Sequence, residues 1–215
     1  MMTIICKLSP PDNFESQMRY LSEHYDVLSL DSSIEDWFEN GSRDAVIISF
    51  DDGYYDFLHN AVPVLEKYHI PATIFITTGN IDSAQENWTD SILRVIFSNN
   101  KHNDFFTFEI EFYHGKYPTR YYQEKYDFYQ LVRRIFLVSS AEKRKMYEDA
   151  LLKWSGLSRT GRKNRRIITS EEIKEISQKR GISIGAHTVT HACLSHLSVS
   201  EQRTEAVCLS VWFVG

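Results

Sequence analysis

Hydrophobic runs alternate with amphipathic stretches along the first eighty residues of the chain. The runs "AVIISF" at residues 45–50 and "ATIFI" at residues 72–76 are mostly apolar and rich in β-branched residues, as is typical of strands buried on both faces. The segments at residues 12–25 and 58–69 instead have apolar residues at helical spacing, and Pro63 is expected in the first turn of its helix or at a kink. This order predicts an α/β fold with parallel strands joined by right-handed crossovers.

The pattern changes between residues 81 and 166. The segments at residues 121–139 and 140–156 are amphipathic and predict helices, the second opened by Ser139 and Glu142. The segment "FFTFEIEFYHGK" at residues 105–116 alternates like one half-exposed strand. We interpret this block as a mostly helical insertion within a single domain.

The strand and helix alternation returns after the insertion. Thr169 and Glu172 form a capping box for a helix that Gly181 is expected to end, and the strand-like run "ISIGAH" follows at residues 182–187. Just before the capping box, "RTGRKNRR" at residues 159–166 contains five basic residues in eight. This segment is either a solvated loop or a clamp for an anionic group such as a phosphate.

Composition and charge narrow the class of protein. A hydrophobic fraction of 42% can build a substantial core, and a net charge of −5 gives no electrostatic reason to expect nucleic acid or an anionic membrane as a partner. The sequence contains no apolar window of about 18 residues, so no membrane span is expected. The apolar run at the start is too short for a signal peptide, and we therefore expect a cytoplasmic location.

Two motifs carry candidate chemistry. Asp51 and Asp52 follow the strand at residues 45–50, and Gly53 permits a sharp turn behind them. His187 and His191 follow the strand at residues 182–187 and can converge on a helix or on a turn. Each motif alone is also compatible with a turn, a helix cap or a chance surface pair.

The expected topology brings these two motifs together. Because the carboxyl ends of parallel strands gather at one rim, two carboxylates and two imidazoles would meet there. Two imidazoles and a carboxylate suit a divalent transition metal with open positions, as hydrolysis requires. One aspartate would bind the cation, and its neighbour would stay ionised beside it.

These motifs resemble a known family. "SFDDGYYDF", "PATIFITTG" and "IGAHTVTHACLSHLS" are similar to the aspartate motif, the following strand and the metal-histidine motif of the polysaccharide deacetylase family, carbohydrate esterase family 4, also called the NodB homology domain. The resemblance covers about residues 12–80 and 167–205. It implies a partial, distorted (β/α) barrel and a divalent metal ion, most often zinc.

The resemblance also implies roles for single residues. Asp52, His187 and His191 would be the metal ligands, and Asp51 would be the general base. Tyr54 is a candidate substrate-binding residue whose backbone N–H could contact an oxyanion. The reaction would be hydrolysis of an N-acetyl group on an amino-sugar carbohydrate, with release of acetate.

The sequence departs from the family pattern at its C-terminal end. Members continue with Tyr-Pro-Phe-Gly-like, Trp/Asp and Leu-x-His motifs, the last of which supplies the general acid, whereas this chain ends with "EAVCLSVWFVG". We therefore expect the domain to be incomplete, with metal binding but weak or no turnover.

Two other functions stay open at this stage. The chain could be a non-catalytic carbohydrate- or metal-binding remnant of the family, which metal analysis combined with an acetate assay would reveal. It could also be a phosphatase or phosphotransferase with Asp51 as a nucleophile. In that case activity would depend on Asp51 but not on His187.

Overall fold

A parallel β-sheet, with strands from both ends of the chain, forms one half of the molecule. The computed structural model describes residues 2–5, 11–31, 37–39, 41, 43–98, 104–110 and 113–207. The strands of the sheet are β1 (Met2–Ile5), β2 (Asp26–Leu28), β3 (Ala45–Phe50), β4 (Ala72–Ile76) and β7 (Ile182–Ala186). They pair in the order β1-β3-β4-β7, with β2 also on β3, and every pairing is parallel.

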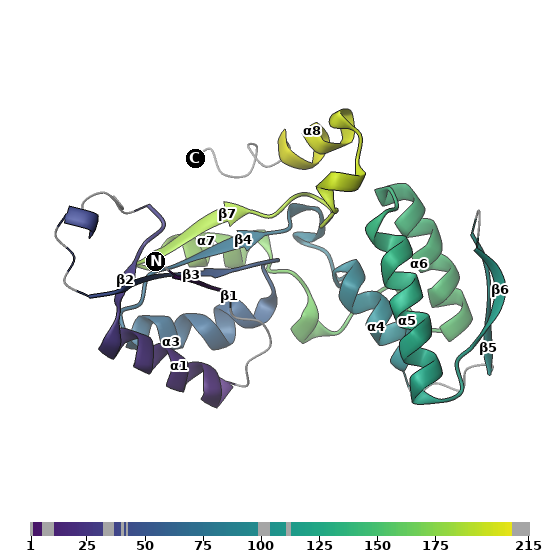
Figure 1. Ribbon diagram of the computed structural model, residues 1–215, viewed down its shortest axis with the longest axis horizontal. Helices are drawn as coiled ribbons and strands as arrows, with labels where there is room; N and C mark the ends of the chain where they lie inside the picture. The colour runs from purple at the N-terminus through teal and green to yellow at the C-terminus, as the bar shows by residue number, and fades with distance from the viewer. Residues whose placement is uncertain are drawn as a thin grey trace.

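Helices cover this sheet, as Figure 1 shows. They are α1 (Pro11–His24), α3 (Val62–Lys67) and α7 (Ser170–Ser177), while α8 (Val199–Val207) lies beyond the carboxyl end of β7. The predicted α/β class and the partial, distorted barrel are thereby confirmed. Pro63 lies in the first turn of α3, directly after a π-helical turn at Phe57–Ala61, so the proline is accommodated at a helix start.

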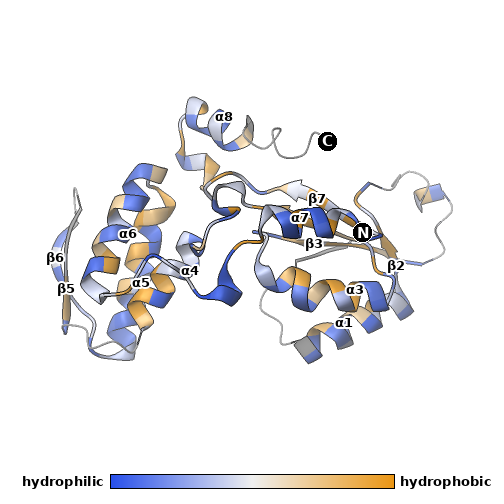
Figure 2. Ribbon diagram, turned by 180° about the vertical axis from the view of Figure 1, so that it is seen from behind, coloured by the Kyte–Doolittle hydropathy of each residue, from blue (hydrophilic) through white to orange (hydrophobic). Residues whose placement is uncertain are grey.

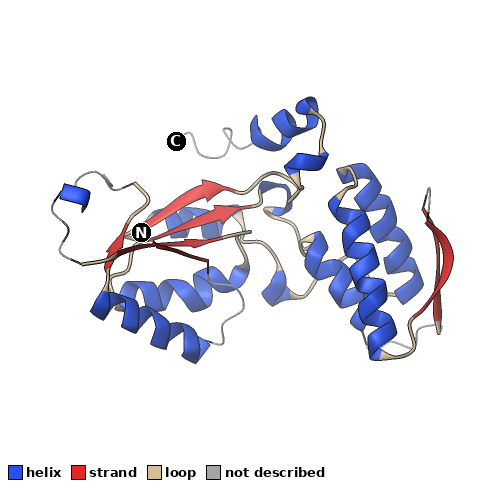
Figure 3. Cartoon of the chain, in the orientation of Figure 1, coloured by secondary structure: helices blue, strands red, loops and turns tan. Residues whose placement is uncertain are grey.

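The second half of the molecule consists of helices and a small hairpin (Figure 3). The helices are α4 (Trp88–Phe97), α5 (Tyr122–Leu137) and α6 (Ala141–Ser155), and the strands β5 (Phe105–Ile110) and β6 (Tyr113–Pro118) pair antiparallel. The single half-exposed strand expected at residues 105–116 is therefore wrong, because the chain reverses within it and the two halves pair. Short 3₁₀ turns occupy Thr78–Asn80, Lys163–Arg165 and Leu194–His196.

Two separate hydrophobic clusters stabilise these two halves, as the orange faces in Figure 2 indicate. The barrel cluster includes Ile48, Leu65 and Ile74, all fully buried, and the insertion cluster includes Val132 and Leu151, also fully buried. The division into one domain with an insertion at residues 81–166 remains our interpretation of the chain's organisation.

Of the three helix boundaries inferred from the sequence, one is confirmed and two are wrong. Thr169 and Glu172 form the predicted capping box of α7, but that helix ends at Ser177, and Gly181 instead lies with φ of 80° in the turn before β7. The N-cap of α6 is Ser140 rather than Ser139, because the Ser140 side chain accepts the N–H of Lys143.

The C-terminal segment in which the sequence departs from the family pattern lies partly outside the described residues. Residues 208–215, which include most of "EAVCLSVWFVG", are not described by the structure. Among the helices that are described, none is both long enough and apolar enough to cross a membrane.

Candidate metal centre

A tight turn at the carboxyl end of β3 holds the aspartate pair. Asp52 and Gly53 both have left-handed backbone conformations, with φ of 73° and 81°. A Cβ atom added to Gly53 would lie 2.8 Å from Cγ2 of Ile76, so glycine is required by both conformation and space. The N–H of Thr77 donates to the carbonyl of Asp52 at 3.1 Å, which fixes this turn against the end of β4.

The histidine pair lies on a turn after β7 and not on a helix. The N–H of His187 donates to the carbonyl of Ile76 at 2.8 Å, and the hydroxyl of Thr77 donates to the carbonyl of His187 at 3.2 Å. The chain then bends back through Thr188 and His191, whose φ values are 61° and 53°. Both imidazoles therefore return to the rim that carries Asp52.

Asp52, His187 and His191 converge at this rim. The Nε2 atoms of His187 and His191 lie 3.5 Å and 3.1 Å from Oδ1 of Asp52, and one ligand atom from each residue lies within 4.8 Å of the other two. Ligands about 2.0–2.1 Å from a tetrahedral zinc ion lie about 3.3 Å apart. The donor atoms and their separations therefore fit a divalent metal ion.

The other two predicted site residues lie beside this triad in the chain. Asp51 is half-buried at the end of β3, and its carbonyl accepts the N–H of Gly53 at 3.0 Å. Tyr54 is half-buried, and its hydroxyl donates to Oδ2 of Asp90 at 2.5 Å. Burial, together with the negative charge of Asp90, raises the pKa of the Tyr54 phenol, so this side chain stays neutral and is engaged with α4. The catalytic role of Asp51 and the substrate-binding role of Tyr54 remain predictions.

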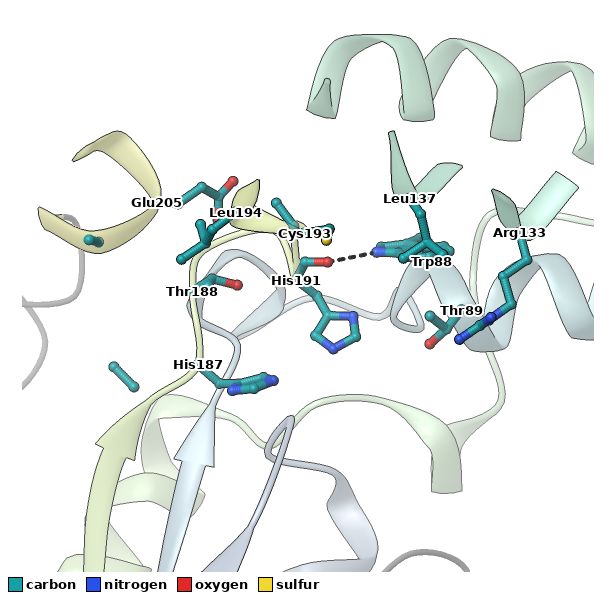
Figure 4. Close-up of a pocket in the computed structure, with 13 residues that line it drawn as sticks. Trp88, Thr89, Arg133, Leu137, His187, Thr188, His191, Cys193, Leu194 and Glu205 are labelled. Carbon is teal, nitrogen blue, oxygen red and sulfur yellow. Dashed lines mark hydrogen bonds between the residues drawn. The ribbon is translucent and has the colours of Figure 1, made fainter. Parts of the chain in front are cut away.

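A cavity of about 560 Å³ opens next to the two imidazoles. Figure 4 shows that it lies between the histidine turn and the helices α4 and α5. Its wall combines His187 and His191 with apolar and polar side chains from those helices, among them Trp88, Leu137 and the exposed Arg133. The volume is in the range of pockets that bind small molecules.

The basic segment at residues 159–166 is tied into the structure by ion pairs. Arg162 Nε lies 2.7 Å from Oε1 of Glu86, whose side chain is fully buried, and Arg166 Nη1 lies 2.7 Å from Oε2 of Glu172. Arg159 pairs with Glu148 and Asp149. These three arginines pair with carboxylates of the chain, whereas residues 162–164 of the segment are solvent-exposed, so both interpretations of the segment remain predictions.

Several residues of the site were not singled out from the sequence. Arg133 and Leu137 line the cavity from α5, and Arg144 of α6 and Glu205 of α8 contact the histidine turn. The sequence gives no signal for them, since they are spaced like ordinary helix residues. Trp88 is buried in the insertion cluster and also donates its Nε1–H to the carbonyl of His191 at 3.2 Å.

Comparisons with known proteins agree with the fold and the motifs. The model of a family described as "Polysaccharide deacetylase" matches residues 39–208. The chain is 42% identical over 73 residues to a poly-beta-1,6-N-acetyl-D-glucosamine N-deacetylase of Staphylococcus epidermidis, a match that covers 33% of this chain and 25% of that enzyme.

A solved structure has a similar fold. It is that of the Streptococcus pyogenes deacetylase PplD in complex with acetate, with a TM-score of 0.50 and 19% identity, and the match covers 98% of this chain and 64% of that one. The chain thus spans about a quarter of the curated relative and less than two thirds of the solved structure.

Proposed function

The chain belongs to the polysaccharide deacetylase family, and on that premise we propose that it is a metal-dependent hydrolase that removes N-acetyl groups from an amino-sugar carbohydrate. The observation that carries this proposal is the convergence of Asp52, His187 and His191, whose two histidines also line a cavity. Oδ1 of Asp52 and the two Nε2 atoms would hold a divalent ion, which we take to be zinc.

The proposed roles follow from the position of each side chain. A divalent ion at this site supplies a Lewis acid for the acetyl carbonyl and lowers the pKa of water toward 7. Asp51, next to the triad but not part of it, accepts a proton from the attacking water. The bond between the carbonyl carbon and the nitrogen breaks, acetate leaves, and the sugar amine takes up a proton.

The cavity contributes to binding. Trp88 and Leu137 present an apolar wall beside the imidazoles, and a sugar ring can pack its C–H face against such a surface. Tyr54 would act through its backbone N–H, because its hydroxyl is already bonded to Asp90.

The test measures bound metal and acetate release from N-acetylglucosamine oligomers, with zinc or cobalt added. The parent chain is expected to bind one ion and to release acetate only weakly, and only in the presence of that ion. His187→Ala should lose both metal and activity, whereas Asp51→Asn should keep the metal and lose acetate release.

Two results would contradict the proposal. Stoichiometric metal binding without acetate release from the parent chain would favour the non-catalytic remnant. Activity that survives His187→Ala but not Asp51→Asn would favour a phosphate-transfer reaction with Asp51 as nucleophile.

A further inference from the structure

The turn that carries His191 has a backbone that needs outside support. Thr188 and His191 both have left-handed conformations, with φ of 61° and 53°. Non-glycine residues keep such conformations only where surrounding contacts fix them. The N–H groups of Thr78 and Gly79 donate to the carbonyls of Thr188 and Val189 at 3.1 Å and 2.8 Å. These bonds fix the carbonyls of residues 188 and 189 but do not reach residues 190 and 191.

Glu205 of α8 binds the N–H groups of residues 189 and 190 in this turn. Its side chain reaches the turn in Figure 4, and the residue is only 6% exposed. Oε2 accepts the N–H groups of Val189 and Thr190 at 2.9 Å each, and Oε1 accepts the hydroxyl of Thr190 at 2.5 Å. One buried carboxylate therefore binds three donors of the histidine turn.

Arg144 of α6 binds residues 190 and 191 of the same turn. It is only 5% exposed, its Nη2–H donates to the Thr190 hydroxyl oxygen at 2.6 Å, and its Nη1–H donates to the carbonyl of His191 at 3.3 Å. The Thr190 hydroxyl therefore bridges a buried cation and a buried anion. Burial lowers the pKa of the Arg144 guanidinium, and the charge of Glu205 opposes this effect.

Trp88 of α4 completes the support at His191. Its Nε1–H donates to the same carbonyl that Arg144 contacts, and the guanidinium of Arg144 lies over its ring, 5.6 Å from the centroid. The dashed line in Figure 4 marks the bond from Trp88. Two donors from the insertion thus converge on the backbone of a candidate metal ligand.

We propose that Arg144 and Glu205 are positioning residues for the metal centre: together, through Thr190, they fix the backbone that aims the His191 imidazole at Asp52. This inference rests on the proposed function in that it takes the triad as a metal site. It adds that an arginine of the insertion and a glutamate of α8 set the affinity of that site. A purely structural role would be to anchor α6 and α8, with no effect on the metal.

The chemistry favours positioning over anchoring. The side-chain hydrogen bonds described above for Arg144 and Glu205 all end on residues 189–191, next to or at the ligand. Partners that orient a metal ligand commonly change metal affinity by about 10–100-fold when removed. A buried charge that has lost its partner is also costly, so each residue depends on the other.

The experiment measures cobalt affinity and the visible absorption spectrum of the cobalt-loaded full chain, with thermal unfolding of the metal-free protein in parallel. Arg144→Met and Glu205→Gln should each weaken cobalt binding by about tenfold or more and alter the spectrum. Arg144→Lys, which keeps the charge and one donor, should recover part of the affinity.

Arg159→Met is the matched control. Arg159 pairs with Glu148 and Asp149 of the same helix α6, and its loss should lower the unfolding temperature without changing cobalt affinity or the spectrum. If Arg144→Met does not fold, Thr190→Val, which removes the bridging hydroxyl at similar volume, gives the same comparison.

The outcomes separate this inference from the proposed function. Parent-like affinity and spectrum in Arg144→Met and Glu205→Gln would overturn the inference alone, as would an equal affinity loss in Arg159→Met. Cobalt binding by the parent no tighter than by His187→Ala would overturn both. Tight binding without acetate release would overturn only the proposed deacetylation.

Discussion

The ion pair between Arg166 and Glu172 should make the stability of the chain depend on pH. The two N–H groups of the guanidinium donate to the two carboxylate oxygens at 2.7 Å each, and the N–H of Thr169 adds a bond of 2.7 Å. The hydrogen bond from Arg166 and the bond from Thr169 outweigh burial and lower the pKa of Glu172 from 4.5 to about 2. The perturbation that tests this is Glu172→Gln.

The magnitude follows from that change in pKa. Each pKa unit corresponds to about 1.4 kcal/mol, so a fall from 4.5 to about 2 is worth about 3 kcal/mol at neutral pH. The two side chains are 17% and 16% exposed, and solvent screening reduces the effect to about 2 kcal/mol. Because the folded-state pKa is depressed, this stability is complete above about pH 5 and is lost as pH falls toward 2.

The assay is urea unfolding of the parent chain, Glu172→Gln and Glu171→Gln at pH 7 and pH 3. Glu171 is the neighbouring carboxylate in the same first turn of α7 but is solvent-exposed, so its variant should stay within about 0.5 kcal/mol of the parent. Glu172→Gln should lose about 2 kcal/mol of unfolding free energy at pH 7 and about half as much at pH 3. An equal loss at both pH values would refute the electrostatic reasoning and leave only the loss of the helix cap.

Three further substitutions test other parts of the structure. Gly53→Ala should destabilise the fold by about 1–3 kcal/mol and weaken zinc binding, because of its positive φ and the close contact with Ile76; a variant as stable as the parent, with equal zinc affinity by titration, would contradict this. Glu86→Gln should lower the free energy of unfolding in urea by about 3–5 kcal/mol, because the buried carboxylate neutralises Arg94 and Arg162. A loss under about 1 kcal/mol would mean that water takes the place of the carboxylate beside these arginines. Leu151→Ala should cost about 2–5 kcal/mol in the same assay, since the side chain is fully buried in the insertion cluster, and a neutral effect would show that the cluster contributes little.

The strands β3 and β4 were predictable because nearly all of their residues are buried. Residues 45–50 and 72–76 carry mostly apolar runs that are typical of a covered parallel sheet, and the structure has β3 and β4 at these positions. Parallel topology then brings Asp52 to the same rim as His187 and His191, because both motifs leave their strands at the same end.

The hairpin and the cap of α6 were missed for local reasons. Apolar and polar residues alternate along both strands of the hairpin. The two-residue period therefore runs without a break through residues 105–116, and the sequence gives no sign that the chain reverses there. Ser139 and Ser140 are adjacent and equally good caps, and only the observed bond to the N–H of Lys143 distinguishes them. Neither error changes the site, because both lie away from the strand ends.

The contacts of Arg144 and Glu205 were unpredictable for a different reason. Periodicity and capping describe one segment at a time, whereas these contacts join residues 46 and 15 positions apart in the chain, from α6 and α8. Arg144 lies among other basic residues in "KRK", where a solvated surface position is the ordinary expectation, yet it is the one that the fold buries.

The positions of the buried Arg144 and Glu205 can be explained by the directionality of their hydrogen bonds. Hydrophobic packing is non-directional, so the barrel and insertion clusters can stabilise their two halves without fixing the orientation of a single imidazole. Hydrogen bonds from a rigid guanidinium and a carboxylate are directional, and they act here on the backbone of residues 189–191, where a small rotation would move the His191 ring away from Asp52. Buried ion pairs contribute little to stability compared with apolar residues of equal size. The presence of Arg144 and Glu205 beside the triad, bridged by the Thr190 hydroxyl, is therefore better explained by the demand for ligand geometry than by the demand for a stable fold.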